Sequence, residues 1–158
     1  MKHTFSRTPL AIILFATFCL SLAPEMRAED EGHCSNDTVA GKWGYSYTGS
    51  LILPTGAIPV ASVGRFTLDA EGNLSGTQTR SNDGSSSVET ITATLTVNAD
   101  CTGTGNLNVY DSGQLVRSAV LAFVFVDGSK EFRVIFESLT PTGGPSLPVV
   151  ITANGKKL

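Results

Sequence analysis

The feature that most limits what this chain can fold into is an alternation of apolar and polar residues that recurs from residue 41 onward. A period of two is typical of β-strands with one buried face. No stretch after residue 28 keeps apolar residues at helical spacing for three turns. The segments between the alternating runs are mostly short and rich in glycine, as hairpin turns are. The pattern therefore predicts an all-β protein.

Eight strands are expected, over residues 41–53, 60–69, 73–80, 88–98, 105–110, 115–126, 131–139 and 148–155. No connection between them is long enough for the helix of a parallel crossover, so neighbours should pair antiparallel in a meander. An eight-stranded meander can close into a barrel, which removes its exposed edges. We therefore predict an antiparallel up-and-down β-barrel, with a two-sheet β-sandwich as the alternative. The strand at 115–126 is apolar on both faces, which predicts cover on both sides.

The first 28 residues have the pattern of a secretory signal peptide. They contain a basic start, an apolar run over residues 9–23 and a small residue, Ala28, at the predicted cleavage site. The apolar run is shorter than the about 20 residues of a spanning helix. We expect one mature domain over residues 29–158, secreted or periplasmic, with no membrane span after cleavage.

The charge of the predicted mature domain argues against nucleic acid as a partner. The domain holds 8 basic and 13 acidic residues, a net charge of −5. Its basic residues are scattered singly, apart from Lys156 and Lys157, whereas a phosphate-binding surface needs clustered lysine and arginine. The glycine-rich segments at 103–108 and 141–146 lack the strand-to-helix context of phosphate loops, and no cofactor is expected.

Cleavage would remove Cys19 and leave Cys34 and Cys101. Two cysteines in an exported domain most often form a disulfide. This bridge would enclose 66 residues and would tie the N-terminal arm to one end of the sheet. His33 lies beside Cys34, but zinc normally takes three or four ligands, so no metal site is expected.

One face of the first predicted strand carries Trp43, Tyr45 and Tyr47. A small barrel is either filled by its own side chains or holds one small ligand, so these aromatic residues are candidates for core or for a cavity lining. Residues of other strands could join them: Phe66, Leu68, Phe123, Phe125, Phe132, Val134 and Phe136.

Arg117 is the candidate polar group of such a ligand site, because the strand around it is apolar. An inward arginine can hold a carboxylate with two hydrogen bonds, and Glu89 or Glu137 could be its partner within the chain. The alternative for Arg117, as for Arg65 and Arg133, is an outward position in solvent.

Features of an enzyme are few, and no catalytic residue is assigned. His33 is the only histidine of the predicted mature domain, so a Ser-His-Asp triad lacks a base within the strands. Glu89 and Glu137 could perform acid–base chemistry only if they meet.

The stretch AGKWGYSY, residues 40–47, contains a G-x-W motif and resembles the first strand of the calycin superfamily, the lipocalins and avidins. In those families the tryptophan closes one end of the barrel. Unlike the avidins this chain has a single tryptophan, and the later lipocalin motifs are missing. The stretches at 64–76 and 97–109 look more like a group of small secreted bacterial proteins of unassigned function, with barrels of the lipocalin or allene-oxide-cyclase type. The resemblance implies fold and export, and no activity.

These observations favour non-catalytic binding of a small, largely apolar molecule inside the barrel. A cyclase- or isomerase-like enzyme on the same barrel is one alternative. A structural or interaction protein that acts through its outer surface is another. The sequence leaves open whether the protein is a monomer or a homo-oligomer.

Overall fold

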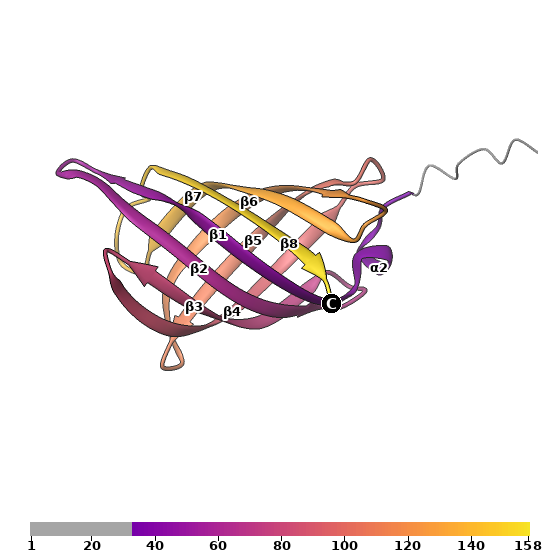
Figure 1. The fold of residues 1–158 in the computed structure, drawn as a ribbon, viewed down its shortest axis with the longest axis horizontal. Helices are drawn as coiled ribbons and strands as arrows, with labels where there is room; N and C mark the ends of the chain where they lie inside the picture. Colours follow the sequence, from indigo (N-terminus) through magenta and orange to yellow (C-terminus); the bar gives the residue numbers. More distant parts are fainter. Residues whose placement is uncertain (1–32) are drawn as a thin grey trace, which may run out of the picture. The chain divides into compact units, whose positions relative to one another are not determined.

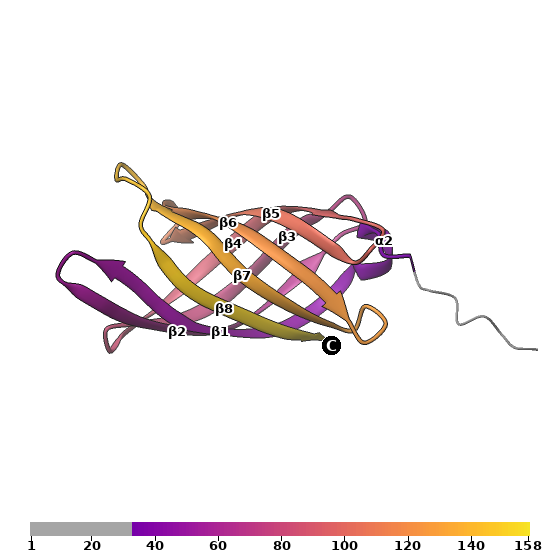
Figure 2. The ribbon, with the colours of Figure 1, turned by 90° about the horizontal axis from the view of Figure 1, so that it is seen from above.

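The computed structural model describes residues 33–158, which form a closed barrel of eight antiparallel strands (Figures 1 and 2). Each strand pairs with its neighbours in the sequence, and β8 pairs with β1. The strands are β1 (Gly41–Leu53), β2 (Gly56–Leu68), β3 (Asn73–Asn82), β4 (Ser85–Val97), β5 (Thr102–Asp111), β6 (Gln114–Val126), β7 (Glu131–Pro141) and β8 (Val149–Lys157). The predicted up-and-down barrel is confirmed, and the sandwich alternative is wrong because the β1–β8 pairing leaves no open sheet. The predicted signal peptide lies outside the described residues.

Several strands run further toward the turns than the sequence pattern suggests. Residues 54–59 were expected to be a loop, but β2 already begins at Gly56. The turns that follow β3 and β5 are two residues long, Asp83–Gly84 and Ser112–Gly113, and both residues of each turn have positive φ. Turns of this kind match the twist of antiparallel strands, so pairing continues up to the turn.

Alternation places one face of each strand inside the barrel and the other in solvent. In β6 the inward side chains include Ala119, Leu121 and Phe123, all buried. The outward Val120 and Val126 are each 37% exposed. The expectation that this strand is covered on both faces is therefore wrong, because a barrel of this size has a single interior and nothing in residues 33–158 forms a second layer over β6.

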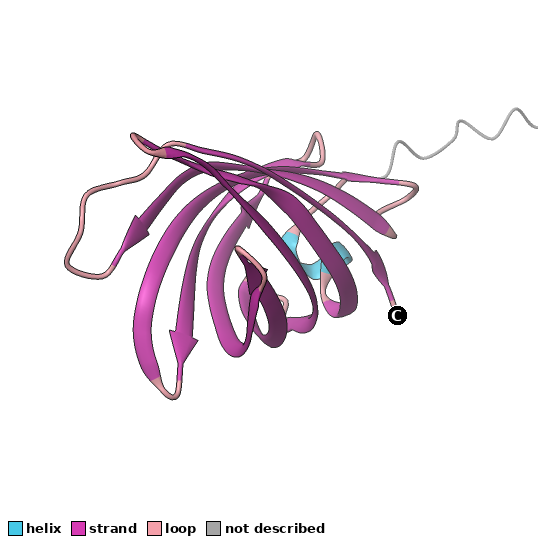
Figure 3. Ribbon diagram, turned by 60° about the vertical axis from the view of Figure 1, so that its left-hand side comes forward, coloured by secondary structure: helices cyan, strands magenta, loops and turns pink. Residues whose placement is uncertain are grey.

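A short helix, α2 (Asn36–Val39), lies at one end of the barrel (Figure 3). Its Asn36 side chain bonds the backbone of β4, accepting from the Val97 amide at 3.1 Å. The Trp43 indole nitrogen donates to the Val39 carbonyl at 3.1 Å, and both residues are fully buried. The helix and Trp43 together therefore close this end, in the position that the calycin resemblance implies for the tryptophan.

The predicted disulfide between Cys34 and Cys101 is present. Cys101 lies in the turn between β4 and β5, and the Cys34 amide also donates to the carbonyl of Ala99 in that turn. The bridge therefore holds Cys34, and α2 that follows it, against the closed end of the barrel.

Removing this bridge should destabilise the fold without changing its topology. The double variant Cys34→Ser with Cys101→Ser should lose about 4 kcal/mol of unfolding free energy, because the unfolded chain regains the freedom of a long loop. Guanidinium denaturation without reductant measures the difference. Reductant should lower the stability of the wild type to that of the double variant. Equal stability of the two proteins without reductant would contradict the structural role assigned to the bridge.

Candidate functional site

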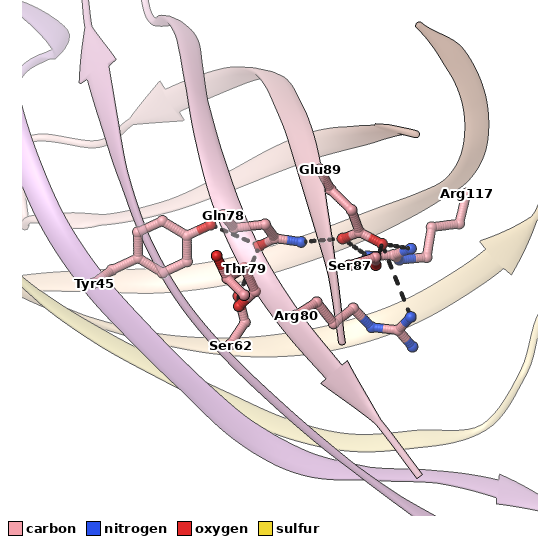
Figure 4. Close-up of polar contacts among 8 residues, drawn as sticks. All are labelled: Tyr45, Ser62, Gln78, Thr79, Arg80, Ser87, Glu89 and Arg117. Carbon is pink, nitrogen blue, oxygen red and sulfur yellow. Dashed lines mark hydrogen bonds and ion pairs between the residues drawn. The ribbon is translucent and has the colours of Figure 1, made fainter. Parts of the chain in front are cut away.

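A cluster of polar side chains lies inside the barrel, toward the end where β3 stops and β4 and β6 begin (Figure 4). Its charged members are Arg80 of β3, Glu89 of β4 and Arg117 of β6. The strand period places them there: each is two residues from another inward side chain, such as Ile91 beside Glu89 and Ala119 beside Arg117. Charged residues rarely occupy such positions unless they are paired, so each contact matters.

Glu89 and Arg117 form a bidentate ion pair. Arg117 Nη1 donates to Oε1 at 2.8 Å, and Nη2 donates to Oε2 at 2.5 Å. The side chains are only 3% and 11% exposed, respectively. Of the two partners considered for Arg117, Glu89 is the one that meets it. Glu137 is exposed at an irregularity of the β6–β7 ladder, where Val120 pairs with Ser138 and Leu121 with Phe136.

Gln78 extends this pair toward the apolar part of the interior. Its Nε2 donates to Glu89 Oε2 at 2.6 Å, and its Oε1 accepts from the Tyr45 hydroxyl at 2.7 Å. The Ser62 hydroxyl lies 3.3 Å from the same Oε1. Hydrogen bonds therefore connect β1, β2, β3, β4 and β6 through side chains inside the barrel (Figure 4).

Arg80 brings a second positive charge to this cluster. Its Nη1 is 4.0 Å from Glu89 Oε1, and its side chain is 12% exposed. Within the part of the chain that the structure describes, Glu89 is the one carboxylate within 4.0 Å of either arginine. Two guanidinium groups and one carboxylate leave the cluster with a formal charge of +1.

The ionisation of Glu89 follows from competing effects. Burial alone would raise the pKa of this carboxyl group, because it removes water from the charged form. Hydrogen bonds from Arg117 and Gln78, together with the two arginine charges, outweigh burial and hold the pKa below its usual value. Burial raises the pKa of the Tyr45 and Tyr47 hydroxyl groups, which therefore stay protonated. Glu89 is thus a fixed anion at neutral pH.

Between the cluster and the closed end lies an apolar cavity of about 70 Å³. Aromatic and aliphatic side chains form nearly all of its wall, and Gln78 contributes a polar group. The lining residues are Tyr45, Tyr47, Phe66, Leu68, Leu74, Gln78, Ile91, Leu95, Leu107, Leu121, Phe123, Phe125, Phe132, Val134, Phe136 and Ala153. The buried residues of all eight strands pack around this void, so the interior combines a packed core with a small apolar cavity.

A smaller void of about 10 Å³ lies among the polar residues and is lined by both arginines. It shares four lining residues with the apolar cavity: Tyr47, Gln78, Leu107 and Phe136. The barrel wall beside it is incompletely paired, because the β7–β8 ladder ends at Ile135 and Thr152. Phe136 and Ile151, the next residues along these strands, both line the smaller void.

The structure brings most of the predicted lining residues to one place. Tyr45, Tyr47, Phe66, Leu68, Phe123, Phe125, Phe132, Val134 and Phe136 line the apolar cavity. Trp43 does not; its ring packs against Phe125 and Phe132, with centroids 5.6 and 5.4 Å away, and closes the end of the barrel. Arg117 lines the smaller void instead. A role of these residues in ligand binding remains a prediction.

Sequence reasoning missed Gln78 and Arg80. Both share the inward face of β3 with the buried Leu74, four and six residues earlier. Their even spacing from Leu74 could have predicted that both side chains point inward. The predicted strand ended at residue 80, however, which placed Arg80 beside a turn. Arg65 and Arg133 have outward, exposed positions, and Arg133 pairs with Glu131 on the surface.

Residues 33–158 contain no group of three or more histidine, cysteine, aspartate or glutamate side chains that could hold a metal ion. No helix within this range is long and apolar enough to cross a membrane.

No family model and no curated protein matches this chain. Solved structures do match. A redesigned beta barrel, mFAP1, bound to DFHBI, has 16% sequence identity and a TM-score of 0.50, and the alignment covers 78% of this chain and 98% of that one. EF1p2_mFAP2b bound to DFHBI has 12% identity and a TM-score of 0.51, with 79% and 100% covered. At these identities the matches show a shared β-barrel fold alone.

The charge balance of the cluster predicts unequal effects of removing its members. Glu89→Gln leaves two buried arginines without a carboxylate and should lower the unfolding free energy by about 3–5 kcal/mol. Arg117→Met should cost less, because Arg80 remains beside Glu89. Urea denaturation at pH 7 measures both.

The pH dependence of the same proteins provides the control. Because the pKa of Glu89 is lowered on folding, its contribution is complete above the usual glutamate pKa of about 4.3 and is lost as the pH falls below it. The stability difference between wild type and Glu89→Gln should therefore shrink below about pH 4. A difference that stays constant down to pH 3 would refute the assigned ionisation.

Proposed function

We propose that this chain is an exported β-barrel protein that binds one small, mainly apolar molecule inside the barrel and does not transform it. The observation that carries the proposal is the apolar cavity beside the polar cluster. Protein interiors are close-packed, and the aromatic residues around this void leave it unfilled. An apolar wall with a few polar groups at one side is the usual construction of a small-molecule site.

The size of the cavity sets the class of ligand. A volume of about 70 Å³ is smaller than the about 150 Å³ of an engineered cavity that binds benzene or xenon. A ligand of a few non-hydrogen atoms fits with small side-chain adjustments. A longer one has to displace side chains toward the smaller void, which Tyr47 and Phe136 separate from the cavity.

Two further observations support parts of the proposal. Barrels of similar fold have been solved with the compound DFHBI bound, so a fold of this kind can hold a small molecule. Export is supported by the predicted signal peptide and by the Cys34–Cys101 bridge, since disulfides persist in oxidising compartments.

An enzyme of the cyclase or isomerase type is the second candidate, and one observation favours it. Gln78 and Tyr45 place polar groups on the cavity wall, where they could orient a substrate. Glu89, however, is held as an anion by Arg117, and burial keeps Tyr45 protonated, so neither is poised to exchange a proton at neutral pH. The arrangement therefore supports binding better than proton-transfer catalysis.

A cavity-filling substitution tests the proposed binding. Benzene and xenon should give saturable NMR shifts of the methyl groups of Leu95 and Leu121, which line the cavity. Ala153→Leu places extra carbon atoms in the void and should weaken binding of both probes by about tenfold or more, since the site no longer has room. Thermal unfolding of the variant verifies that it is folded.

Ala122→Leu is the matched control, because Ala122 lines a shallow depression on the outer face of β6 and β7 and does not line the cavity. This variant should bind both probes as the wild type does. Wild-type protein that shows no saturable shift, or Ala153→Leu protein that binds with unchanged affinity, would refute the proposed site.

A further inference from the structure

The polar cluster has one positive charge more than it needs for its own pairing. Both oxygens of Glu89 accept hydrogen bonds from Arg117, and Oε2 also accepts one from Gln78. At 4.0 Å from Oε1, Arg80 is within ion-pair range of Glu89 but too far for a hydrogen bond. Glu89 thus neutralises one arginine through direct bonds, and the second shares its charge only at a distance.

Placing the Arg80 charge inside the barrel costs folding free energy, which suggests that this charge has a function. Moving a guanidinium group out of water costs several kcal/mol unless a counter-charge and hydrogen bonds compensate it. The side chain of Arg80 is only 12% exposed. Burial and the nearby Arg117 charge lower its pKa, and the Tyr47 hydroxyl and Glu89 offset this lowering only in part. An outside anion that reaches Arg80 would complete the charge balance, with two positive and two negative groups.

We propose that Arg80 binds the carboxylate of a small organic acid whose apolar part occupies the neighbouring cavity. This inference rests on the proposed function and specifies its ligand. Arg80 lines the smaller void, which Tyr47 and Phe136 separate from the apolar cavity, so a ligand that displaces these two side chains would reach both. The anionic group and the apolar chain of a single ligand would then meet complementary walls.

The chemistry of the site favours a carboxylate over a phosphate. The cluster has one net positive charge, which a carboxylate neutralises, whereas a phosphate would bring up to two negative charges. A planar carboxylate also matches the planar fork of an arginine side chain.

A comparison of hexanoate with 1-hexanol at pH 7 tests this inference. The two probes share a carbon chain and differ in charge, and binding is followed by calorimetry and by NMR shifts of Leu121, which lines the cavity. Wild-type protein should bind hexanoate about tenfold or more tightly than 1-hexanol, as expected for hydrogen bonds to a charged group. Arg80→Met, which keeps length but removes charge, should bind the two with similar affinity.

Arg65→Met is the matched control, because Arg65 is exposed on the outer face of β2 and should leave the preference for hexanoate unchanged. If Arg80→Met fails to fold, NMR of the wild-type protein still tests the role of Arg80. The side-chain Nε–H signal of Arg80 should shift with hexanoate and stay in place with 1-hexanol.

The outcomes separate this inference from the function on which it rests. Equal binding of hexanoate and 1-hexanol to wild-type protein would overturn the carboxylate site and leave the binding barrel intact. A preference for hexanoate that survives in Arg80→Met would overturn the role of Arg80. If neither probe binds and the smaller benzene and xenon also fail, both proposals fall together.

Discussion

Glu89 and Arg117 form a buried ion pair inside the barrel through two hydrogen bonds. The arrangement of the other polar side chains and of the voids around them depends on this pair. Removing one partner of such a pair is costly, whereas replacing the whole pair by apolar residues is often neutral or stabilising. Stability alone therefore gives little reason for three charged groups inside a small barrel. The pair keeps Glu89 ionised, and Gln78 links Glu89 to Tyr45 through two hydrogen bonds. Arg80 remains as a second cation that Glu89 neutralises only in part.

The ion pair also divides the interior into two regions of different chemistry. On one side, aromatic and aliphatic residues surround a void that Trp43 and α2 separate from solvent at the closed end, where the Cys34–Cys101 bridge holds the arm in place. On the other side, the two arginines face a smaller void next to the point where the β7–β8 ladder stops. A molecule with an acidic group and a short apolar part is complementary to both regions at once. The disulfide ties the closed end, whereas the wall beside the smaller void is less completely paired.

The sequence was sufficient for the fold because the signals for it are local. Period-two alternation and short turns determine strand order, and two cysteines in a predicted exported domain determine the bridge. The site was only partly predictable, because which charged residues meet depends on register between strands. Glu89 and Arg117 lie on β4 and β6, which do not pair with each other, so their contact spans β5 on the inner face of the barrel. Arg80 was hidden by a strand predicted two residues too short, and no sequence pattern reports how much of a barrel interior is left unfilled.

The central claim is that the interior of this barrel is a site for a small organic acid. A native mass spectrum of the protein recovered without reductant from a host that exports it tests this claim most directly. The account predicts the mass of residues 29–158 less two hydrogens, with added mass that leaves on denaturation and is identified as a monocarboxylic acid. A neutral compound in the released fraction, or a ligand-free chain when the host medium is supplied with short-chain acids, would contradict it.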